Sequence, residues 1–279
     1  MNQIVKSQMR RNPRRLLVLT VFLLLACGMS ARAENGKGWV KKKNQVYYYE
    51  NRKPVTGLKR IGRHDYYFDS KGVQGTSWRK IGNDYYYFRC EEKAEGYLVK
   101  NTDRNGIKLG KDGKAILSSD RAKKKADLMA RVSVYLDKII AKQKAVLADK
   151  RIKLRVCYDY LRKNYPYRYV SHFMKKERDF DLKSVEVILD CGYADCHPYA
   201  FTFAYLSNAL GFSDITVYSW FSKKWQTGHS WVRIGNRVYD VSLGRHNRKS
   251  YELFGMGWSR YFRKYSYYKI KAERHLDKL

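Results

Sequence analysis

An aromatic and glycine pattern recurs through residues 38–116 and limits what this part of the chain can fold into. Trp39, Leu58 and Trp78 follow one another at spacings of 19 and 20 residues. Aromatic runs follow them at the same period, at residues 47–49, 66–68 and 85–88. Short aromatic strands that alternate with glycine turns predict β-hairpins, and such hairpins must stack because each cannot bury its apolar face alone. Residues 106–116 have the pattern of a degenerate last unit.

The order Gly-Trp, then Tyr-Tyr-Phe, then Gly resembles the cell-wall-binding repeats of choline- and glucan-binding bacterial surface proteins. In that family, aromatic residues of adjacent units cage a choline headgroup or stack on sugars. The resemblance therefore implies that residues 34–116 bind a wall polymer. The candidate binding residues are Trp39, Tyr48, Tyr67 and Trp78. The alternative for each of them is a place in the hairpin core, since half of the residues in a stacked hairpin face inward.

Two departures from that family pattern bear on the ligand. Leu58 stands where a second tryptophan is expected, and lysines and arginines crowd the aromatic positions. An aromatic cage attracts a cation through the ring quadrupole, and nearby positive charge opposes that attraction. An anionic glycan or a teichoic-acid-like polymer is therefore favoured over choline as the partner.

The first 33 residues have the features of a secretory signal peptide. Four arginines between residues 10 and 15 precede an apolar run at residues 16–26, and Ala31-Arg32-Ala33 offers a cleavage site. The apolar run is shorter than the about 20 residues that a membrane-spanning helix needs. We therefore expect a secreted, cell-wall-associated protein. The less favoured alternative is a lipoprotein anchored through Cys27, because residues 24–27 loosely match a lipoprotein box.

The formal net charge of +32, from 58 Lys+Arg against 26 Asp+Glu, indicates a polyanionic partner. Removing the first 33 residues takes away six basic and no acidic side chains, which leaves a charge of +26. For an exported protein the partner is then a wall polymer, and no nucleic acid is expected. Four cysteines remain, too few for a disulfide framework in so long a chain. No cofactor and no stable oligomer are expected.

Two helices are predicted after the repeats. Residues 117–149 contain a charged linker that turns into a helix with an apolar face, beginning near Ser119. A second helix is predicted at about residues 150–164, with Cys157 as a small buried apolar residue. Pro166 follows and ends it.

The stretch at residues 190–212, DCGYADCHPYAFTFAYLSNALGF, predicts a helix that starts at a cysteine. Its apolar side chains recur at helical spacing, and Asp195 is expected to cap the helix N-terminus. Pro198 falls in the first turn, where its missing N–H costs nothing. The helix dipole is then expected to lower the pKa of the Cys196 thiol, and His197 is expected to add local positive charge.

Residues 229–242, HSWVRIGNRVYDVS, predict a β-hairpin that turns at residues 235–236. In that register Trp231 faces Asp240, and His229 lies two residues along on the same face. His229 and Asp240 then become diagonal neighbours about 7–8 Å apart in the backbone, within side-chain reach. The chain order of a cysteine at a helix start, then His229, then Asp240 suggests a nucleophile, a base and an orienting acid.

Residues 150–242 resemble the transglutaminase-like superfamily through three pieces, CHPYAFTFAYLSNALGF, GHSWV and VYDV. The resemblance implies an α+β, papain-like catalytic domain over residues 150–279, with a cysteine at a helix N-terminus packed on a small antiparallel sheet. It assigns Cys196 as the nucleophile, His229 as the general base and Asp240 as the residue that orients the histidine. No metal is needed for this chemistry.

The chemistry of such a triad is acyl transfer on a peptide or protein substrate through a thioester that water or an amine resolves. The backbone N–H of Cys196 should line the oxyanion hole, with a second donor from residues 165–169. Hydrolysis is favoured over crosslinking. The alternative is a non-catalytic wall-binding protein whose transglutaminase-like domain only binds peptide. The hypothesis of an exported nucleic-acid-binding protein rests on charge alone and is the least favoured.

Overall fold

The computed structural model describes residues 36–42, 45–90, 96–145, 148–170, 179–222, 227–246, 253–265 and 272–276. The expected signal peptide and Cys27 lie outside these residues. Among the helices in the described ranges, none is both long enough and apolar enough to cross a membrane.

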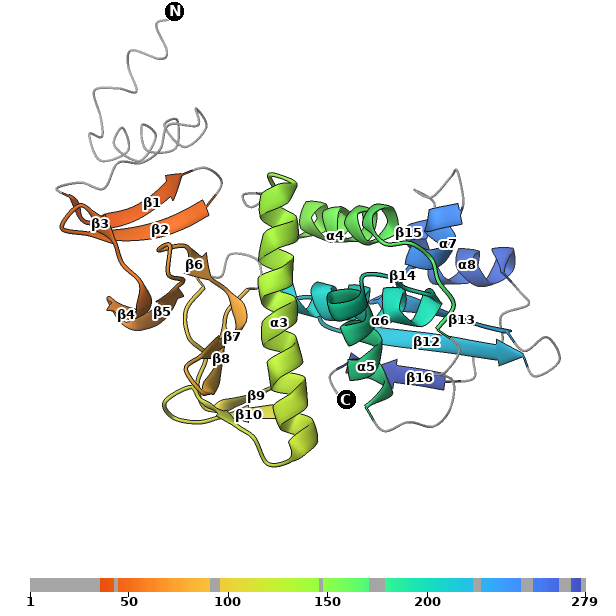
Figure 1. The fold of residues 1–279 in the computed structure, drawn as a ribbon, viewed down its shortest axis with the longest axis horizontal. Helices are drawn as coiled ribbons and strands as arrows, with labels where there is room; N and C mark the ends of the chain where they lie inside the picture. Colours follow the sequence, from red (N-terminus) through yellow and green to blue (C-terminus); the bar gives the residue numbers. More distant parts are fainter. Residues whose placement is uncertain are drawn as a thin grey trace, which may run out of the picture.

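The N-terminal part is a series of β-hairpins, as the repeat pattern predicts (Figure 1). Its strands are β1 (Gly38–Lys42), β2 (Gln45–Glu50), β3 (Lys53–Pro54), β4 (Gly57–Ile61), β5 (His64–Phe68), β6 (Gln74–Gly75), β7 (Ser77–Ile81), β8 (Asp84–Phe88), β9 (Thr102–Arg104), β10 (Ile107–Leu109) and β11 (Ala115–Ile116). They form small antiparallel sheets that each contain two or three neighbouring strands. We call residues 36–116 the repeat module.

The strand register shows the repeat directly. In three successive hairpins the residue at the same repeat position lies opposite a tyrosine, with the pairs Trp39 and Tyr48, Leu58 and Tyr67, and Trp78 and Tyr87. The turns of the second and third hairpins begin at glycines with φ of 59° and 61°. Glycine adopts this conformation without the steric cost that a Cβ would bring.

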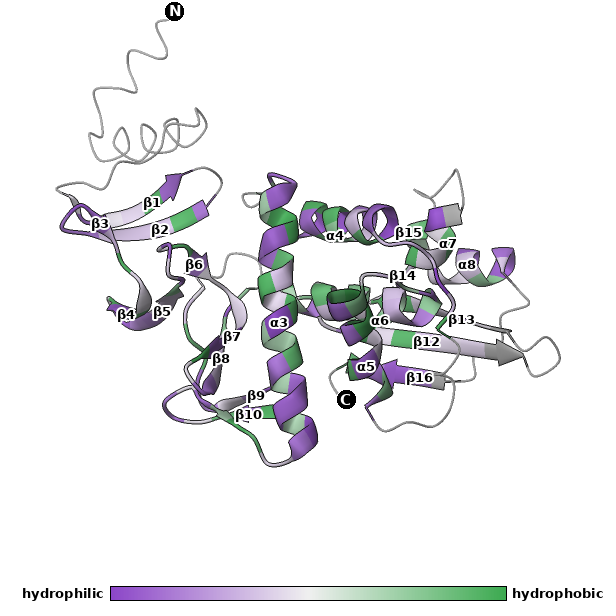
Figure 2. Cartoon of the chain, in the orientation of Figure 1, coloured by the Kyte–Doolittle hydropathy of each residue, from purple (hydrophilic) through white to green (hydrophobic). Residues whose placement is uncertain are grey.

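The long helix α3 (Asp120–Lys142) stands between the repeat module and the rest of the molecule (Figure 1). Ser119 caps it, as its Oγ accepts a hydrogen bond from Ala122 N at 3.1 Å. Purple and green segments alternate along the helix in Figure 2, which reflects its charged and apolar faces. The apolar face lies in one hydrophobic core with Trp78 of the repeat module and Phe203 of α6. Helix α3 therefore packs against both parts of the chain.

The C-terminal part is an α+β unit with one antiparallel sheet. Its helices are α4 (Lys150–Asn164), α5 (Phe180–Glu186), a π-helical turn η3 (Val187–Cys191), α6 (Cys196–Ala209), α7 (Val241–His246) and α8 (Trp258–Lys264). Its strands are β12 (Ile215–Ser222), β13 (Thr227–Ile234), β14 (Arg237–Tyr239), β15 (Phe254–Gly257) and β16 (Ala272–His275), in the order β15-β14-β13-β12-β16. The predicted helix at residues 150–164 and the predicted helix start at Cys196 are both confirmed.

Both faces of this sheet are covered in its centre. Val217 and Val232 lie in the main core with α6. Trp231 and Val238 face the opposite way and form a second apolar cluster with Tyr261 of α8. Every residue of α6 is buried. This helix is therefore central to the domain, and its first residue is held in a fixed place against the sheet.

Candidate functional site

The N-terminus of α6 is fixed by Asp195, the predicted capping residue. Its Oδ1 accepts a hydrogen bond from His197 N at 3.0 Å, and its Oδ2 accepts one from Val170 N at 2.9 Å. The segment before Val170 also pairs with the chain, since Tyr167 and Ala194 form a parallel bridge. The segment at residues 166–170 is thus tied to the start of the helix that begins at Cys196.

The hairpin of β13 and β14 brings His229 to Asp240. The register has Val232 opposite Tyr239 and Ile234 opposite Arg237, which is the predicted pairing. His229 Nε2 lies 2.7 Å from Asp240 Oδ2, and the carboxyl group is fully buried. Because an ionised carboxylate only accepts hydrogen bonds, Nε2 donates and Nδ1 is the ring nitrogen that can accept a proton.

Asp240 is held by groups that the sequence analysis did not identify. Its Oδ1 accepts hydrogen bonds from Leu243 N at 3.0 Å and from Ser242 Oγ at 3.3 Å. Tyr261 Oη donates to Oδ2 at 2.7 Å, and Tyr158 Oη donates to the backbone oxygen of Asp240 at 2.9 Å. Tyr158 could have been found as a core position of its helix. Tyr261 had no signal in the sequence, because nothing there relates α8 to the hairpin.

The Cys196 thiol lies near the strand that carries His229, but it is buried away from solvent. Its side chain is 5% exposed, and Sγ lies 3.5 Å from His197 Nδ1. Sγ also lies 3.7 Å from the carbonyl oxygen of Gly228, the neighbour of His229 on β13. The fold therefore places the thiol beside the strand that carries the histidine.

Two electrostatic expectations for this site are wrong in the described structure. Burial raises the pKa of the Cys196 thiol, and the negative charges of Asp195 and Asp240 raise it further. The helix N-terminus does not compensate, because burial disfavours the thiolate more than the backbone N–H groups favour it. Burial also lowers the pKa of His197 to about 4. His197 is therefore neutral near pH 7 and adds no positive charge.

Tyr167 lies against the thiol within the segment where a second oxyanion donor was expected. Burial raises the pKa of its phenol, Cys196 and Asp195 raise it further, and a hydrogen bond from the backbone N–H of Cys196 opposes them. The Tyr167 hydroxyl thus lies near the thiol and the backbone N–H of Cys196, where an oxyanion hole is expected. In this conformation the site is closed.

Three consecutive residues at the helix start also form a possible metal-ligand group. One ligand atom from each of Asp195, Cys196 and His197 lies within 4.8 Å of the others, and all three residues are buried. Both oxygens of Asp195 already accept backbone hydrogen bonds. A metal ion would have to compete with these bonds, so we assign no metal to the site.

Trp39 lies at the surface of the repeat module and belongs to an aromatic cluster, which we call the Trp39 cluster. Trp39 is 38% exposed, and its ring centroid lies 5.2 Å from that of Tyr48 and 5.0 Å from that of Tyr66. Both contacts are edge-on. Tyr66 belongs to the next repeat unit and was not among the predicted residues. The cluster therefore joins two adjacent units and brings together two of the four candidates, Trp39 and Tyr48. Tyr48 is only 7% exposed and lies in a hydrophobic cluster with Tyr66 and Phe68, so for this residue the structure supports the alternative of a place in the hairpin core.

The other two candidates lie elsewhere. Trp78 is 1% exposed and packs in the main core, where its Nε1 donates to Asn105 Oδ1 at 3.3 Å. The prediction that Trp78 binds a ligand is therefore wrong, because helix α3 covers this hairpin and removes the ring from solvent. Tyr67 is half-buried, packs near Phe88, and lines a cavity between the repeat module and α3.

A second feature of the repeat module is a basic cavity of about 440 Å³. Its wall carries four basic side chains, from Arg63, Arg89, Lys100 and Arg104, and a single acidic one. The ring of His64 stacks on that of Tyr97 at its edge, with centroids 4.2 Å apart. The formal charge of +32 predicts a positively charged surface, but nothing in the sequence places it at this cavity.

Comparison with known proteins identifies part of the repeat module. Residues 55–102 match the choline-binding repeat family. No curated protein matches the chain. The choline-binding domain of Spr1274 from Streptococcus pneumoniae is 24% identical over 29% of this chain and 94% of its own length, with a TM-score of 0.26.

Two larger solved structures are similar over the same part of the chain. Choline-binding protein F from Streptococcus pneumoniae, solved in the presence of a peptidoglycan analogue, is 27% identical over 29% of this chain and 26% of its own, with a TM-score of 0.26. The modular Cpl-1 endolysin, complexed with a peptidoglycan analogue, is 26% identical over 30% of this chain and 25% of its own, with a TM-score of 0.20. The chain thus spans about a quarter of these two proteins. The family match alone shows that the N-terminal module contains a choline-binding repeat, at residues 55–102.

Proposed function

We propose that the protein is secreted and attaches to the bacterial cell wall through its repeat module, and that the partner is a wall polymer. The observation that carries this proposal is the match of residues 55–102 to the choline-binding repeat family. The module offers two surfaces of different chemistry for such a polymer. The Trp39 cluster suits a cationic headgroup or a sugar ring, and the basic cavity suits phosphate or carboxylate groups.

The excess of positive charge favours the anionic groups of the polymer as the main source of affinity. Four basic residues line the basic cavity, and the whole chain carries a formal charge of +32. Binding through charge is screened by salt, whereas binding of a headgroup in an aromatic cluster competes with the free headgroup.

The test is the retention of the full chain on isolated cell walls and its elution by salt or by free choline. Elution by salt alone supports the anionic polymer, and elution by choline alone assigns the Trp39 cluster as the main site. A chain that does not sediment with walls at low salt would refute attachment altogether.

We further propose a second function, acyl transfer at Cys196 in a transglutaminase-like domain. The supporting observation is the buried hydrogen bond between His229 and Asp240, on the strand whose Gly228 carbonyl the thiol contacts. His229 Nδ1 would take the thiol proton, and the thiolate would add to an amide carbonyl carbon. The protonated histidine would then protonate the leaving amine, which leaves a thioester on Cys196.

Completion of the reaction requires a second nucleophile and a free oxyanion donor. Water that loses its proton to His229 attacks the thioester, releases the carboxylic acid and restores the thiol. The backbone N–H of Cys196 is the expected oxyanion donor, and the Tyr167 hydroxyl lies near it. A bound substrate would therefore contact Tyr167.

The alternative is a wall-binding protein whose C-terminal domain binds peptide without cleaving it. The closed, neutral thiol favours this alternative. Mass spectrometry of wall peptides and proteins incubated with the full chain and a labelled amine separates the outcomes. Shortened peptides indicate hydrolysis, and incorporated label indicates transfer. Unchanged peptides that nevertheless bind the protein support the alternative, and Cys196→Ala supplies the control.

A further inference from the structure

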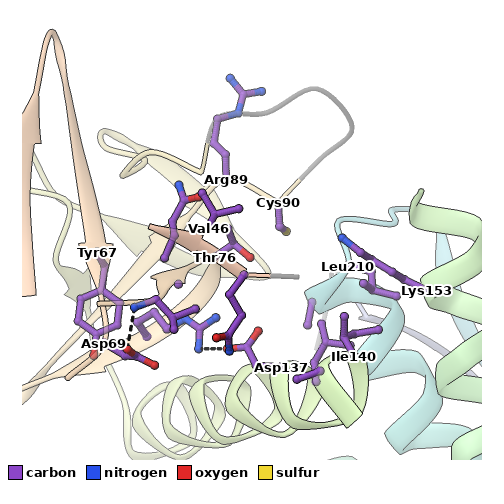
Figure 3. Close-up of a pocket in the computed structure, with 18 of the residues that line it drawn as sticks. Val46, Tyr67, Asp69, Thr76, Arg89, Cys90, Asp137, Ile140, Lys153 and Leu210 are labelled. Carbon is purple, nitrogen blue, oxygen red and sulfur yellow. Dashed lines mark hydrogen bonds and ion pairs between the residues drawn. The ribbon is translucent and has the colours of Figure 1, made fainter. Parts of the chain in front are cut away.

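A cavity of about 460 Å³ lies between the repeat module and helices α3, α4 and α6. One wall comes from the repeat module and includes Thr76 and Cys90, and the other comes from the helices (Figure 3). Its volume is within the roughly 300–1,000 Å³ of small-molecule sites. We call it the junction cavity. It is distinct from the Trp39 cluster and from Cys196, neither of which lines it.

The acidic side chains of the junction cavity already have partners. Asp137 Oδ2 lies 2.7 Å from Arg79 Nη1. Asp69 Oδ1 accepts hydrogen bonds from two backbone N–H groups of its own turn, and Asp149 Oδ1 accepts two at the start of α4. These carboxylates therefore stabilise the residues around the cavity, and few of their oxygens are available to bind a cationic ligand.

The basic side chains are engaged in the same way, with one exception. Arg79 pairs with Asp137, Arg89 Nη1 donates to Tyr97 Oη at 2.6 Å, and Lys150 Nζ donates to the carbonyl oxygen of Gly211 at 2.6 Å. Within the described residues, the Lys153 ammonium has no hydrogen bond or ion pair. Figure 3 shows this side chain extending from α4 toward the space that separates it from the repeat module.

An ammonium in this position is costly without a counterion. Burial lowers the pKa of Lys153, although the charges of Asp137 and Asp149 oppose the shift. A charged group that is partly desolvated gains most from a hydrogen-bonded partner of opposite charge. The wall beside it is apolar, from Leu136, Ile140 and Leu210.

We propose that the junction cavity binds a small anionic ligand with an apolar body, whose carboxylate or phosphate group contacts Lys153 and whose body packs on the apolar wall. A ligand that fills the cavity also lies against the opposite wall, which the repeat module provides, so its binding stabilises the packing of the two parts by mass action. The proposal does not depend on wall attachment or on acyl transfer, because Lys153 and the apolar wall belong to neither of those sites. Arg89 lines both this cavity and the basic cavity, but its Nη1 donates to Tyr97 Oη.

The test is calorimetric titration of the full chain with two probes, N-acetyl-leucine for the carboxylate and monobutyl phosphate for the phosphate. Wild-type protein is expected to bind at least one of them, and the tighter probe identifies the anionic group. Lys153→Met should weaken that binding at least tenfold, since a charge-assisted hydrogen bond is lost. Lys153→Arg should retain it within a few-fold.

The matched control is Lys138→Met, which removes an exposed lysine of α3 that does not line the junction cavity. It should bind as the wild type does. If Lys153→Met fails to fold, Thr76→Glu places a negative charge on the opposite wall and should weaken binding as well. The absence of binding to the wild type at millimolar probe, or equal binding by the Lys153 and Lys138 variants, would overturn the proposal.

Discussion

Tyr261 and His229 share one oxygen of the buried Asp240 carboxyl group. The Tyr261 hydroxyl donates to Asp240 Oδ2 at 2.7 Å, and His229 Nε2 reaches the same atom at 2.7 Å. Tyr261 comes from α8 and His229 from β13, so the carboxylate joins the C-terminal helix to the hairpin. A second donor on the carboxylate oxygen keeps its orientation fixed whether or not the histidine is charged. This makes Tyr261 a positioning residue for the proposed site.

Removal of the Tyr261 hydroxyl should destabilise the fold and weaken any activity. Tyr261→Phe deprives a buried carboxylate of one donor, which should cost about 1–3 kcal/mol of the free energy of unfolding. Urea denaturation measures this loss. Tyr265→Phe is the control, because it removes the hydroxyl of a neighbouring tyrosine whose ring packs on that of Tyr261, with centroids 5.0 Å apart. Equal stability of the two variants would argue against the role of Tyr261.

Alkylation should detect the closed state of Cys196. Because the pKa of its thiol is raised and its side chain is buried, iodoacetamide should label the exposed Cys191 first. Tyr167→Phe removes the hydroxyl that contacts Cys196 and should speed the labelling of Cys196, while Tyr169→Phe should not. Mass spectrometry of tryptic peptides over time follows each thiol. Rapid labelling of Cys196 in the wild type would contradict a closed site.

His197 should make the stability depend on pH in a defined window. Its pKa falls from 6.5 to about 4 on folding, chiefly through burial, with His229 and Arg274 as smaller causes. The unfolded chain then binds more protons than the folded protein, so stability is complete above about pH 6.5 and is lost as the pH falls toward 4. The loss should not exceed about 3–4 kcal/mol of the free energy of unfolding. His197→Asn should flatten the dependence measured by urea denaturation at each pH, and a slope unchanged by the substitution would contradict the assignment.

The two tryptophans of the repeat module should respond differently to truncation. Trp78→Ala removes a core side chain and should cost about 3–5 kcal/mol of unfolding free energy. Trp39→Ala removes a ring that is 38% exposed and should lower stability less, while it weakens retention on isolated cell walls. Urea denaturation and wall sedimentation measure the two effects. If Trp39→Ala lowered the free energy of unfolding as much as Trp78→Ala does, Trp39 would have only a structural role in the core.

Much of the local structure was predictable because it depends on neighbours in the sequence. The capping of α6 by Asp195, the end of α4 before Pro166 and the register of β13 with β14 each follow from a few adjacent residues. The hairpin register in turn placed His229 within reach of Asp240. These predictions succeeded because caps, prolines and two-residue turns act over one turn of helix or one strand pair.

The state of the cysteine was not predictable in this way. A helix N-terminus lowers the pKa of an exposed thiol, but Cys196 is 5% exposed and lies against Tyr167 and His197. Burial depends on what the rest of the chain brings to the helix, and it outweighed the local dipole. For the same reason the pattern could not separate Trp39 from Trp78, which occupy the same position in the repeat.

The repeat period, the helix starts and the pairing of His229 with Asp240 were thus contained in the sequence, since each arises from short-range geometry. The burial of Trp78 under α3, the support of Asp240 by Tyr261 and the position of the Lys153 ammonium in the junction cavity arose only when distant segments packed together. Solvent exclusion is a property of that packing, and it decides which of the candidate side chains can meet a ligand.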